Sequence, residues 1–269
     1  MTAASRLRDI QGMQPTGLLI DIDGVLTVSG EPIEGTVEAF RAVQSSGVPY
    51  RLATNTTTRT RASLGDSLRR VGFDIDDTEL LTAPVATASH LRENHPGARC
   101  FVLSSGDLSG DFTGIDVAAF GEPADVVVLG GAGLVYTHEQ LNHAFNLLLE
   151  GAAFVAMHRN LYWRTAEGMA LDTGAYAMAL EAAVGRSPTV VGKPAPAFFA
   201  AGVHALGVDP GHVLMVGDDI VNDVLGAQAS GRHGCLVRTG KFRADAVGAA
   251  DGEPDMVVDS FADVPELLG

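Results

Sequence analysis

Short apolar runs alternate with longer amphipathic segments along most of the chain. The first apolar run covers residues 17–21, an amphipathic stretch follows at 32–46, and a second apolar run covers 49–53. Buried strands that alternate with crossover helices are typical of an α/β protein with a parallel sheet. The same pattern predicts strands at 189–191, 212–216 and 234–237, helices at 58–72, 197–206 and 220–229, and closing segments at 255–258 and 261–268.

The middle of the chain has an α/β rhythm of its own. It predicts strands at 99–103, 125–129 and 152–156, and helices at 85–93, 139–149 and 175–184. Since insertion into a loop adds a domain with little disturbance, we expect residues 83–187 to form a second domain within the first. The predicted fold is a doubly wound, Rossmann-like parallel-sheet core, residues 1–82 and 188–269, with an inserted α/β cap.

Composition and charge narrow the class of protein. The chain has 269 residues, of which 46% are hydrophobic and 19% charged, which supports a packed core and excludes a disordered chain. Its apolar runs are shorter than the ~18–20 residues that span a bilayer, so we expect no membrane protein. The net charge of −15 disfavours nucleic-acid binding. Residues 1–15 lack the apolar stretch of a secretory signal. Cys100 and Cys235 lack a CxxC spacing, so we expect reduced thiols and a cytoplasmic location.

Two carboxylates follow the first predicted strand. Asp21 and Asp23 stand two residues apart, and Gly24 permits a sharp turn beside them. The carboxyl ends of parallel strands open into the ligand crevice of such sheets, so both should face it. There, one carboxylate can attack phosphorus as a nucleophile and the other can protonate a leaving oxygen. The alternative is an Asp-x-Asp-Gly turn that merely ends a strand.

A second acidic group follows the strand predicted at 212–216. Asp218, Asp219 and Asp223 occupy this loop and the start of the next helix. Helix capping would explain one aspartate there, but not why two strand ends should both be acidic. Converging carboxylates repel one another unless a cation lies among them, and oxygen ligands suit Mg²⁺. We expect Asp219 and Asp223 to support the ligands, with Asp223 also a candidate ligand because it lies one helical turn beyond Asp219.

Two further strand ends carry polar groups that suit a phosphate. Thr54 can donate a hydrogen bond to a phosphoryl oxygen, and Asn55 can orient nearby groups or the substrate. Lys193, which is one of only two lysines, stands between an apolar strand and Pro194, where its ammonium could hold a phosphate oxygen. The alternatives are a solvated polar turn and an ordinary surface lysine.

Together these motifs resemble those of the haloacid dehalogenase (HAD) superfamily of aspartyl-phosphate phosphatases. The segment 21–25 matches the first family motif, Thr54 the second, Lys193 the third, and 217–219 with Asp223 the fourth. The insertion between the second and third motifs resembles the C2-type cap of the class IIA, nagD-like and 4-nitrophenyl phosphatase subgroup. The branch of phospholysine phosphohistidine inorganic pyrophosphate phosphatases is most similar, through segments 191–194, 217–220, 226–228 and 238–242.

The resemblance implies a role for each matching residue. Asp21 would be the nucleophile and Asp23 the general acid/base, while Thr54 and Lys193 would bind the phosphoryl group. Asp21, the backbone carbonyl of Asp23 and Asp218 would ligate Mg²⁺. Because dehalogenase members lack the second aspartate, its presence favours phosphoryl transfer. Thr56 departs from the second asparagine of many subgroup members, which affects only fine substrate contacts.

The cap loops give candidates for substrate contacts. In capped relatives the equivalent loops face the active site, which singles out His158, Asn160, Asp172 and Thr173. A cap hinders polymers, so a small phosphorylated molecule is the expected substrate, and a homodimer through the cap is one expected assembly. A phosphotransferase or phosphomutase of the same fold, and a non-catalytic phosphometabolite-binding protein, are the alternatives. The sequence leaves open which phosphoester, phosphoamide or pyrophosphate is used.

Overall fold

The computed structural model describes residues 14–165 and 168–268, so the prediction for residues 1–15 falls largely outside the described part. The chain divides into two compact units. Unit 1 comprises Met1–Thr54, Leu64–Leu81 and Phe199–Gly269, and unit 2 comprises Asn55–Ser63 and Thr82–Phe198. Unit 2 overlaps the predicted insertion 83–187 and also takes in the segment that follows Thr54; the domain boundaries from the sequence stay a prediction.

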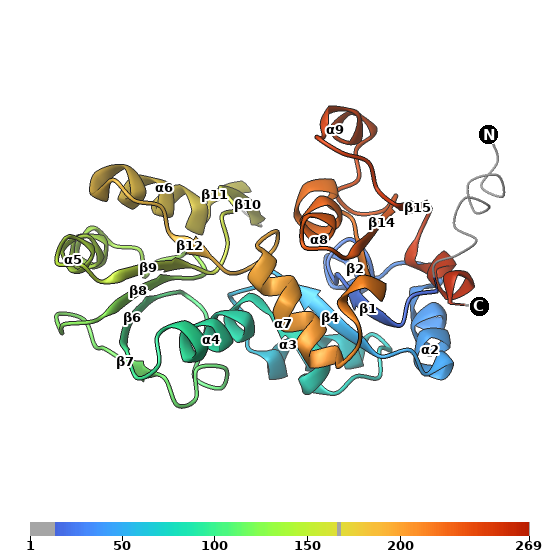
Figure 1. Ribbon diagram of the computed structural model, residues 1–269, viewed down its shortest axis with the longest axis horizontal. Coiled ribbons are helices and arrows are strands. Elements are labelled where there is room, and N and C mark those ends of the chain that lie inside the picture. The colour runs from blue at the N-terminus through green and yellow to red at the C-terminus, as the bar shows by residue number, and fades with distance from the viewer. Residues whose placement is uncertain (1–13, 166–167, 269) are drawn as a thin grey trace. The chain divides into compact units, whose positions relative to one another are not determined.

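Unit 1 is built on a parallel sheet with β1 in its interior (Figure 1). Among the described residues, its strands run in the order β15-β14-β13-β1-β4-β5. Ile20 of β1 lies opposite both Leu52 of β4 and Val216 of β13. Because the chain builds outward from β1 on both sides, the carboxyl ends of β1 and β13 border the place where such sheets bind ligands. The strands are β1 (Gly17–Ile20), β4 (Tyr50–Thr54), β5 (Leu80–Thr82), β13 (Val213–Gly217), β14 (His233–Val237) and β15 (Met256–Val258).

Helices cover both faces of this sheet, as successive side chains of β1 show. Leu18 and Ile20 are fully buried in one cluster with Phe40 of α2. Leu19 points the other way, and its Cδ2 would lie 2.8 Å from a Cβ built on Gly202 of α7. This arrangement confirms the predicted doubly wound α/β fold. The helices that lie wholly or partly in unit 1 are α2 (Thr36–Ser46), α3 (Arg61–Arg70), η2 (Asp77–Glu79), α7 (Pro196–Leu206), η3 (Pro210–His212), η4 (Ile220–Leu225), α8 (Gly226–Ala229), α9 (Ala244–Ala249) and η5 (Phe261–Leu267).

The structure differs from the predicted elements at several places in unit 1; β5 and α9, for example, were not predicted. A hairpin of β2 (Thr27–Val28) and β3 (Glu31–Pro32) precedes α2, which therefore begins at Thr36. Ser29 and Gly30 both have positive φ, 53° and 83°, which is the conformation of a tight two-residue hairpin turn. The helix predicted at 220–229 begins instead as the π-helix η4 and continues as α8.

Unit 2 contains a parallel sheet of its own, with the order β12-β9-β8-β6-β7 among the described residues. All four side chains of β8 are buried, and Val127 and Leu129 belong to a core that also contains Leu147 of α5 and Ala177 of α6. The strands are β6 (Arg99–Leu103), β7 (Asp116–Val117), β8 (Val126–Leu129), β9 (Ala153–Ala156), β12 (Thr189–Val190) and the antiparallel pair β10 (Tyr162–Thr165) and β11 (Gly168–Leu171). The helices are α4 (Ala83–Asn94), α5 (His138–Leu149) and α6 (Thr173–Val184). In the described part of the chain, no helix is long and apolar enough to cross a membrane.

Candidate active site

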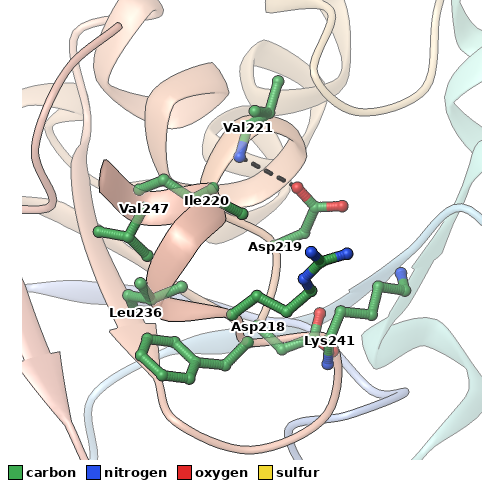
Figure 2. Close-up of a pocket in the computed structure, with 10 residues that line it drawn as sticks. Asp218, Asp219, Ile220, Val221, Leu236, Lys241 and Val247 are labelled. Atoms are coloured by element: carbon green, nitrogen blue, oxygen red, sulfur yellow. Dashed lines mark hydrogen bonds between the residues drawn. The ribbon is translucent and has the colours of Figure 1, made fainter. Parts of the chain in front are cut away.

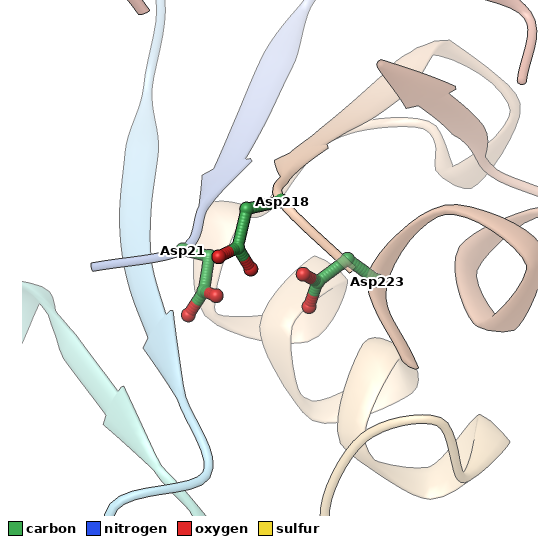
Figure 3. Close-up of side chains that lie close together, drawn as sticks. All are labelled: Asp21, Asp218 and Asp223. Atoms are coloured by element: carbon green, nitrogen blue, oxygen red, sulfur yellow. The ribbon is translucent and has the colours of Figure 1, made fainter. Parts of the chain in front are cut away.

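Three carboxylates from separate parts of unit 1 gather at the ends of β1 and β13. Asp21 directly follows β1, Asp218 directly follows β13, and Asp223 lies on η4 (Figure 3). One oxygen from each lies within 4.8 Å of the other two, and the three residues are 5%, 1% and 1% exposed. The backbone N–H of Asp21 donates to Val216 O at 2.9 Å, which extends the pairing of β1 with β13 to this point. The sheet register therefore brings Asp21 and Asp218 together.

The cluster is electrostatically unfavourable without a cation. Burial and the charge of Asp21 raise the pKa of Asp218 from its ordinary value of 3.8 to about 7. Oδ2 of Asp218 accepts a hydrogen bond from the Lys241 backbone N–H at 2.7 Å. Oδ1 of Asp218 is buried and has no hydrogen-bond partner among the described residues. A buried carboxylate oxygen with no donor, beside two further carboxylates, is the environment expected of a metal ligand.

The donor set fits Mg²⁺. Every candidate ligand atom in the cluster is a carboxylate oxygen, the kind of ligand that this ion prefers. Two oxygens bound to one Mg²⁺ at about 2.1 Å lie at most about 4.2 Å apart, which is compatible with carboxylate oxygens that all lie within 4.8 Å of one another. Asp21 and Asp218 were predicted as ligands, and the structure places Asp223, left open as support or ligand, in the same cluster.

Asp219 lies beside the cluster but caps the next helix. Its Oδ1 accepts hydrogen bonds at 3.0 Å from the backbone N–H groups of both Val221 and Asn222, the first of which is drawn in Figure 2. Its Oδ2 accepts from Asn222 Nδ2 at 2.7 Å. Burial raises the pKa of Asp219, but these hydrogen bonds outweigh it, so the pKa is lowered overall. The backbone N–H of Asp219 donates to Asp223 Oδ2 at 3.1 Å, which helps to fix Asp223.

Lys241 is a charged neighbour that sequence reasoning did not assign to the site. Lys241 and Asp218 are among the residues that line one cavity, of about 180 Å³, and both are drawn in Figure 2. Burial lowers the pKa of Lys241, but Asp218, Asp21 and Asp223 raise it more, so its pKa is raised overall. The ammonium therefore offsets part of the negative charge. Two signals could have found it: its rarity, as one of two lysines in the chain, and its place in segment 238–242, which resembles the related phosphatases.

Asp23 and Thr54 lie at the same edge of the sheet. Asp23 is exposed, on the turn that follows Asp21, and the Ile22 carbonyl closes this turn by accepting the Leu26 N–H at 2.9 Å. Its carboxylate is thus accessible to solvent, as an acid/base group requires. Thr54 is the last residue of β4, which pairs with β1, and it is 3% exposed.

Asn55 and Lys193 lie together within unit 2. Asn55 Oδ1 accepts the Lys193 backbone N–H at 2.8 Å, and Asn55 Nδ2 donates to the Lys193 carbonyl at 2.9 Å. The amide thus pairs with the Lys193 backbone as a neighbouring strand would. Lys193 is 3% exposed, so it is not the ordinary surface lysine of the alternative interpretation.

The four cap-loop candidates also come together within unit 2, largely in its interior. His158 Nε2 lies 3.5 Å from Thr173 Oγ1 and 3.8 Å from Asp172 Oδ1. Asp172 caps α6 by accepting the Thr173 N–H at 2.8 Å, and the Asn160 N–H donates to His158 Nδ1 at 3.4 Å. Burial lowers the pKa of His158, against the opposing effect of Asp172. Their role as substrate contacts stays a prediction.

Comparison with known proteins establishes the class. The family model for haloacid dehalogenase-like hydrolases matches residues 18–118, and one for HAD-hydrolase-like proteins matches residues 190–264. The human phospholysine phosphohistidine inorganic pyrophosphate phosphatase is 37% identical over 258 residues, which cover 94% of this chain and 93% of the relative. The chain belongs to the haloacid dehalogenase-like hydrolase family.

Comparison with solved structures identifies the subgroup of this family that the chain resembles. The p-nitrophenyl phosphatase from Archaeoglobus fulgidus has a TM-score of 0.88 and 29% identity, with coverage of 94% of this chain and 99% of the other. NagD from E. coli K-12 has a TM-score of 0.85 and 26% identity, with coverage of 93% and 98%. The resemblance to the nagD-like, 4-nitrophenyl phosphatase subgroup is confirmed, and the chain is a HAD-type phosphatase.

Proposed function

We propose that this protein hydrolyses a small phosphorylated substrate with the help of Mg²⁺, through an aspartyl-phosphate on Asp21. The observation that carries the proposal is the buried cluster of Asp21, Asp218 and Asp223 at the ends of β1 and β13. Bound there through Asp21, the Asp23 backbone carbonyl and Asp218, with Asp223 in support, Mg²⁺ would neutralise charge and orient the phosphoryl group.

In the proposed first step, a carboxylate oxygen of Asp21 attacks phosphorus in line with the leaving group. The bond from phosphorus to the leaving oxygen breaks as Asp23 gives that oxygen its proton. In the second step, Asp23 takes a proton from water, and the water oxygen attacks phosphorus. The bond between Asp21 and phosphorus then breaks, which releases phosphate and restores both carboxyl groups. The exposure of Asp23 supports this role, because it must exchange protons with solvent.

Thr54 and Lys193 are proposed to bind the phosphoryl oxygens, with Asn55 contributing to this site. Their charge and hydrogen bonds would balance the negative charge that spreads over the equatorial oxygens. The substrates in the name of the human relative, phospholysine, phosphohistidine and inorganic pyrophosphate, join phosphorus to nitrogen or to a second phosphate. These compounds and p-nitrophenyl phosphate are the first to test, with His158, Asn160, Asp172 and Thr173 proposed as substrate contacts.

We also propose a cytoplasmic enzyme that forms a homodimer through unit 2. Both cysteines are buried and free, which supports a reducing compartment. Apolar side chains on the β10–β11 pair are exposed, with Tyr162 at 63%, Met169 at 57% and Leu171 at 61%. Such a group favours a protein contact. Light scattering on the wild type and on Met169→Lys should give a dimer and a monomer, and a monomeric wild type would refute the assembly.

The activity is tested with purified protein after treatment with EDTA. We expect hydrolysis to appear on addition of Mg²⁺, and Asp21→Asn to reduce kcat to less than a few per cent while the protein stays folded. Asp251→Asn, an exposed aspartate in unit 1, is the matched control and should keep wild-type kcat. Hydrolysis by Asp21→Asn at the wild-type rate would refute the nucleophile. Transfer of phosphate to added alcohols instead of water would identify a phosphotransferase.

A further inference from the structure

The turn that follows β14 connects the two halves of the carboxylate site. Thr239 Oγ1 donates a hydrogen bond to the Gly24 carbonyl at 2.5 Å. Two residues later, the Lys241 backbone N–H donates to Asp218 Oδ2 at 2.7 Å. One short turn therefore binds both the segment that carries Asp21 and the loop that carries Asp218, although Gly24 and Thr239 are 215 residues apart in the sequence.

The contact at this turn is too tight to shift without moving Asp218. A Cβ built on Gly240 would lie 2.5 Å from Gly24 Cα and 2.1 Å from Asp218 Oδ2. Both glycines have positive φ, 60° at Gly240 and 91° at Gly24. No side chain separates Gly24 from Gly240. The spacing between the Asp21–Gly24 turn and Asp218 is therefore kept only while the turn at Thr239 stays in place. The Thr239 hydroxyl is the side-chain group that fixes it to Gly24.

We propose that Thr239 is a positioning residue for the Mg²⁺ site, an inference that rests on the proposed function. It acts through Gly24 and the neighbouring Asp23 backbone, and its hydroxyl holds this turn at the distance from Asp218 that the ion requires. Groups that orient metal ligands typically change metal affinity by 10–100-fold when they are lost. Thr239 contacts Gly24 and not a metal ligand itself, so we expect the lower end of this range: loss of its hydroxyl should raise the Kd for Mg²⁺ about tenfold.

The test measures Mg²⁺ binding to EDTA-treated protein by isothermal titration calorimetry, without substrate. Thr239→Val keeps the shape of the side chain and removes the hydroxyl, whereas Thr239→Ser keeps the hydroxyl. Thr36→Val is the matched control, because the Thr36 hydroxyl, in the same unit, can donate to either of two backbone carbonyls, that of Leu26 at 3.0 Å or that of Ile33 at 2.7 Å. We expect only Thr239→Val to bind Mg²⁺ more weakly than the wild type. Thr239→Ser and Thr36→Val should bind it with an affinity close to wild type, even if Thr36→Val has a lower Tm.

The outcomes separate the two proposals. If the wild type binds no Mg²⁺, or Asp218→Asn binds it as well as the wild type, the proposed function fails. If the wild type binds Mg²⁺ through Asp218 and Thr239→Val binds it equally well, the role of Thr239 is refuted. Should Thr239→Val not fold, Thr239→Cys replaces it, because a thiol is a weak donor of similar size. Wild-type affinity in Thr239→Cys would overturn the inference, and a weakened affinity that Thr239→Ser does not share would support it.

Discussion

Replacing Asp218 by asparagine should stabilise the metal-free protein and abolish its response to Mg²⁺. Asp218 is buried beside Asp21, and its pKa in the folded protein is raised to about 7, compared with 3.8 for an exposed aspartate. The folded state therefore holds the proton more tightly than the unfolded state. The resulting stability is fully present below pH 4 and is lost as pH rises to about 7. At pH 8 the ionised Asp218 carboxylate therefore destabilises the folded, metal-free wild type by the full amount, whereas asparagine has no charge and causes no such loss.

The size of the effect follows from this difference in pKa. A change from 3.8 to about 7, at 1.36 kcal/mol per pH unit, corresponds to about 4 kcal/mol at pH 8. Relaxation of the cluster and water entry would reduce it, so we expect a gain of about 1–4 kcal/mol. For a protein of this size, each kcal/mol raises Tm by about 2–4 °C. Asparagine can still accept the Lys241 N–H through its Oδ1, so that contact is retained.

The assay is thermal unfolding of both proteins at pH 5 and pH 8, with EDTA or with Mg²⁺. With EDTA, Asp218→Asn should melt higher than the wild type at pH 8, and the difference should shrink at pH 5. Added Mg²⁺ should raise Tm of the wild type at pH 8 and leave the variant unchanged. A variant that melts lower than the wild type in EDTA at pH 8, and that Mg²⁺ still stabilises, would refute the reasoning.

Three further predictions test the proposed function. Mg²⁺ binding should weaken at low pH, because the ion must displace the Asp218 proton. A carboxyl of pKa about 7 is about 90% protonated at pH 6 and about 10% protonated at pH 8, so calorimetry should give a Kd for Mg²⁺ about tenfold higher at pH 6 than at pH 8. Equal affinities at the two pH values would contradict this. Lys193→Ala should lower kcat by at least about 10²-fold, measured with p-nitrophenyl phosphate, and unchanged kinetics would exclude the lysine from the phosphate site. Gly24→Ala places a Cβ 1.9 Å from Asp218 Oδ2 and should abolish Mg²⁺ stabilisation in thermal unfolding. Gly30→Ala, with a similar positive φ of 83° and nothing within 4 Å of the added Cβ, should keep that stabilisation, and equal behaviour of the two variants would contradict the steric argument.

The alternation of apolar and amphipathic segments predicted the α/β fold because the burial of a strand and the helix that follows it are both encoded in the local pattern. Asp21 and Asp218 were recognisable because each follows an apolar strand directly, and parallel strands bring such positions to one edge. The β2–β3 hairpin was missed although Ser29-Gly30 suits its turn. The strands are only two residues long each, too short to give an alternating pattern.

Other parts of the site depend on contacts that no local pattern encodes. Thr239 and Lys241 reach the site because the turn after β14 lies against Gly24, more than two hundred residues earlier in the sequence. Asn55 was expected to orient nearby groups or the substrate, and the group that its amide hydrogen-bonds with, the Lys193 backbone, could not be named from the sequence. Asp219 and Asp223 look alike in sequence, but one caps η4 and the other joins the carboxylate cluster. The sequence left open whether Asp223 supports the ligands or is one of them, and the folded chain places it in the cluster.

The most direct test of covalent catalysis is mass spectrometry of the Asp23→Asn variant, quenched in acid during turnover with Mg²⁺. With p-nitrophenyl phosphate, whose leaving group departs without a proton, the first step does not need the Asp23 acid, whereas the second step still lacks its base, so the phosphorylated enzyme should accumulate. We predict that the peptide containing Asp21 carries one added phosphoryl group, which is absent when Asp21 is also replaced by asparagine. An unmodified Asp21 peptide, in a variant that still releases phosphate, would contradict attack by this carboxylate.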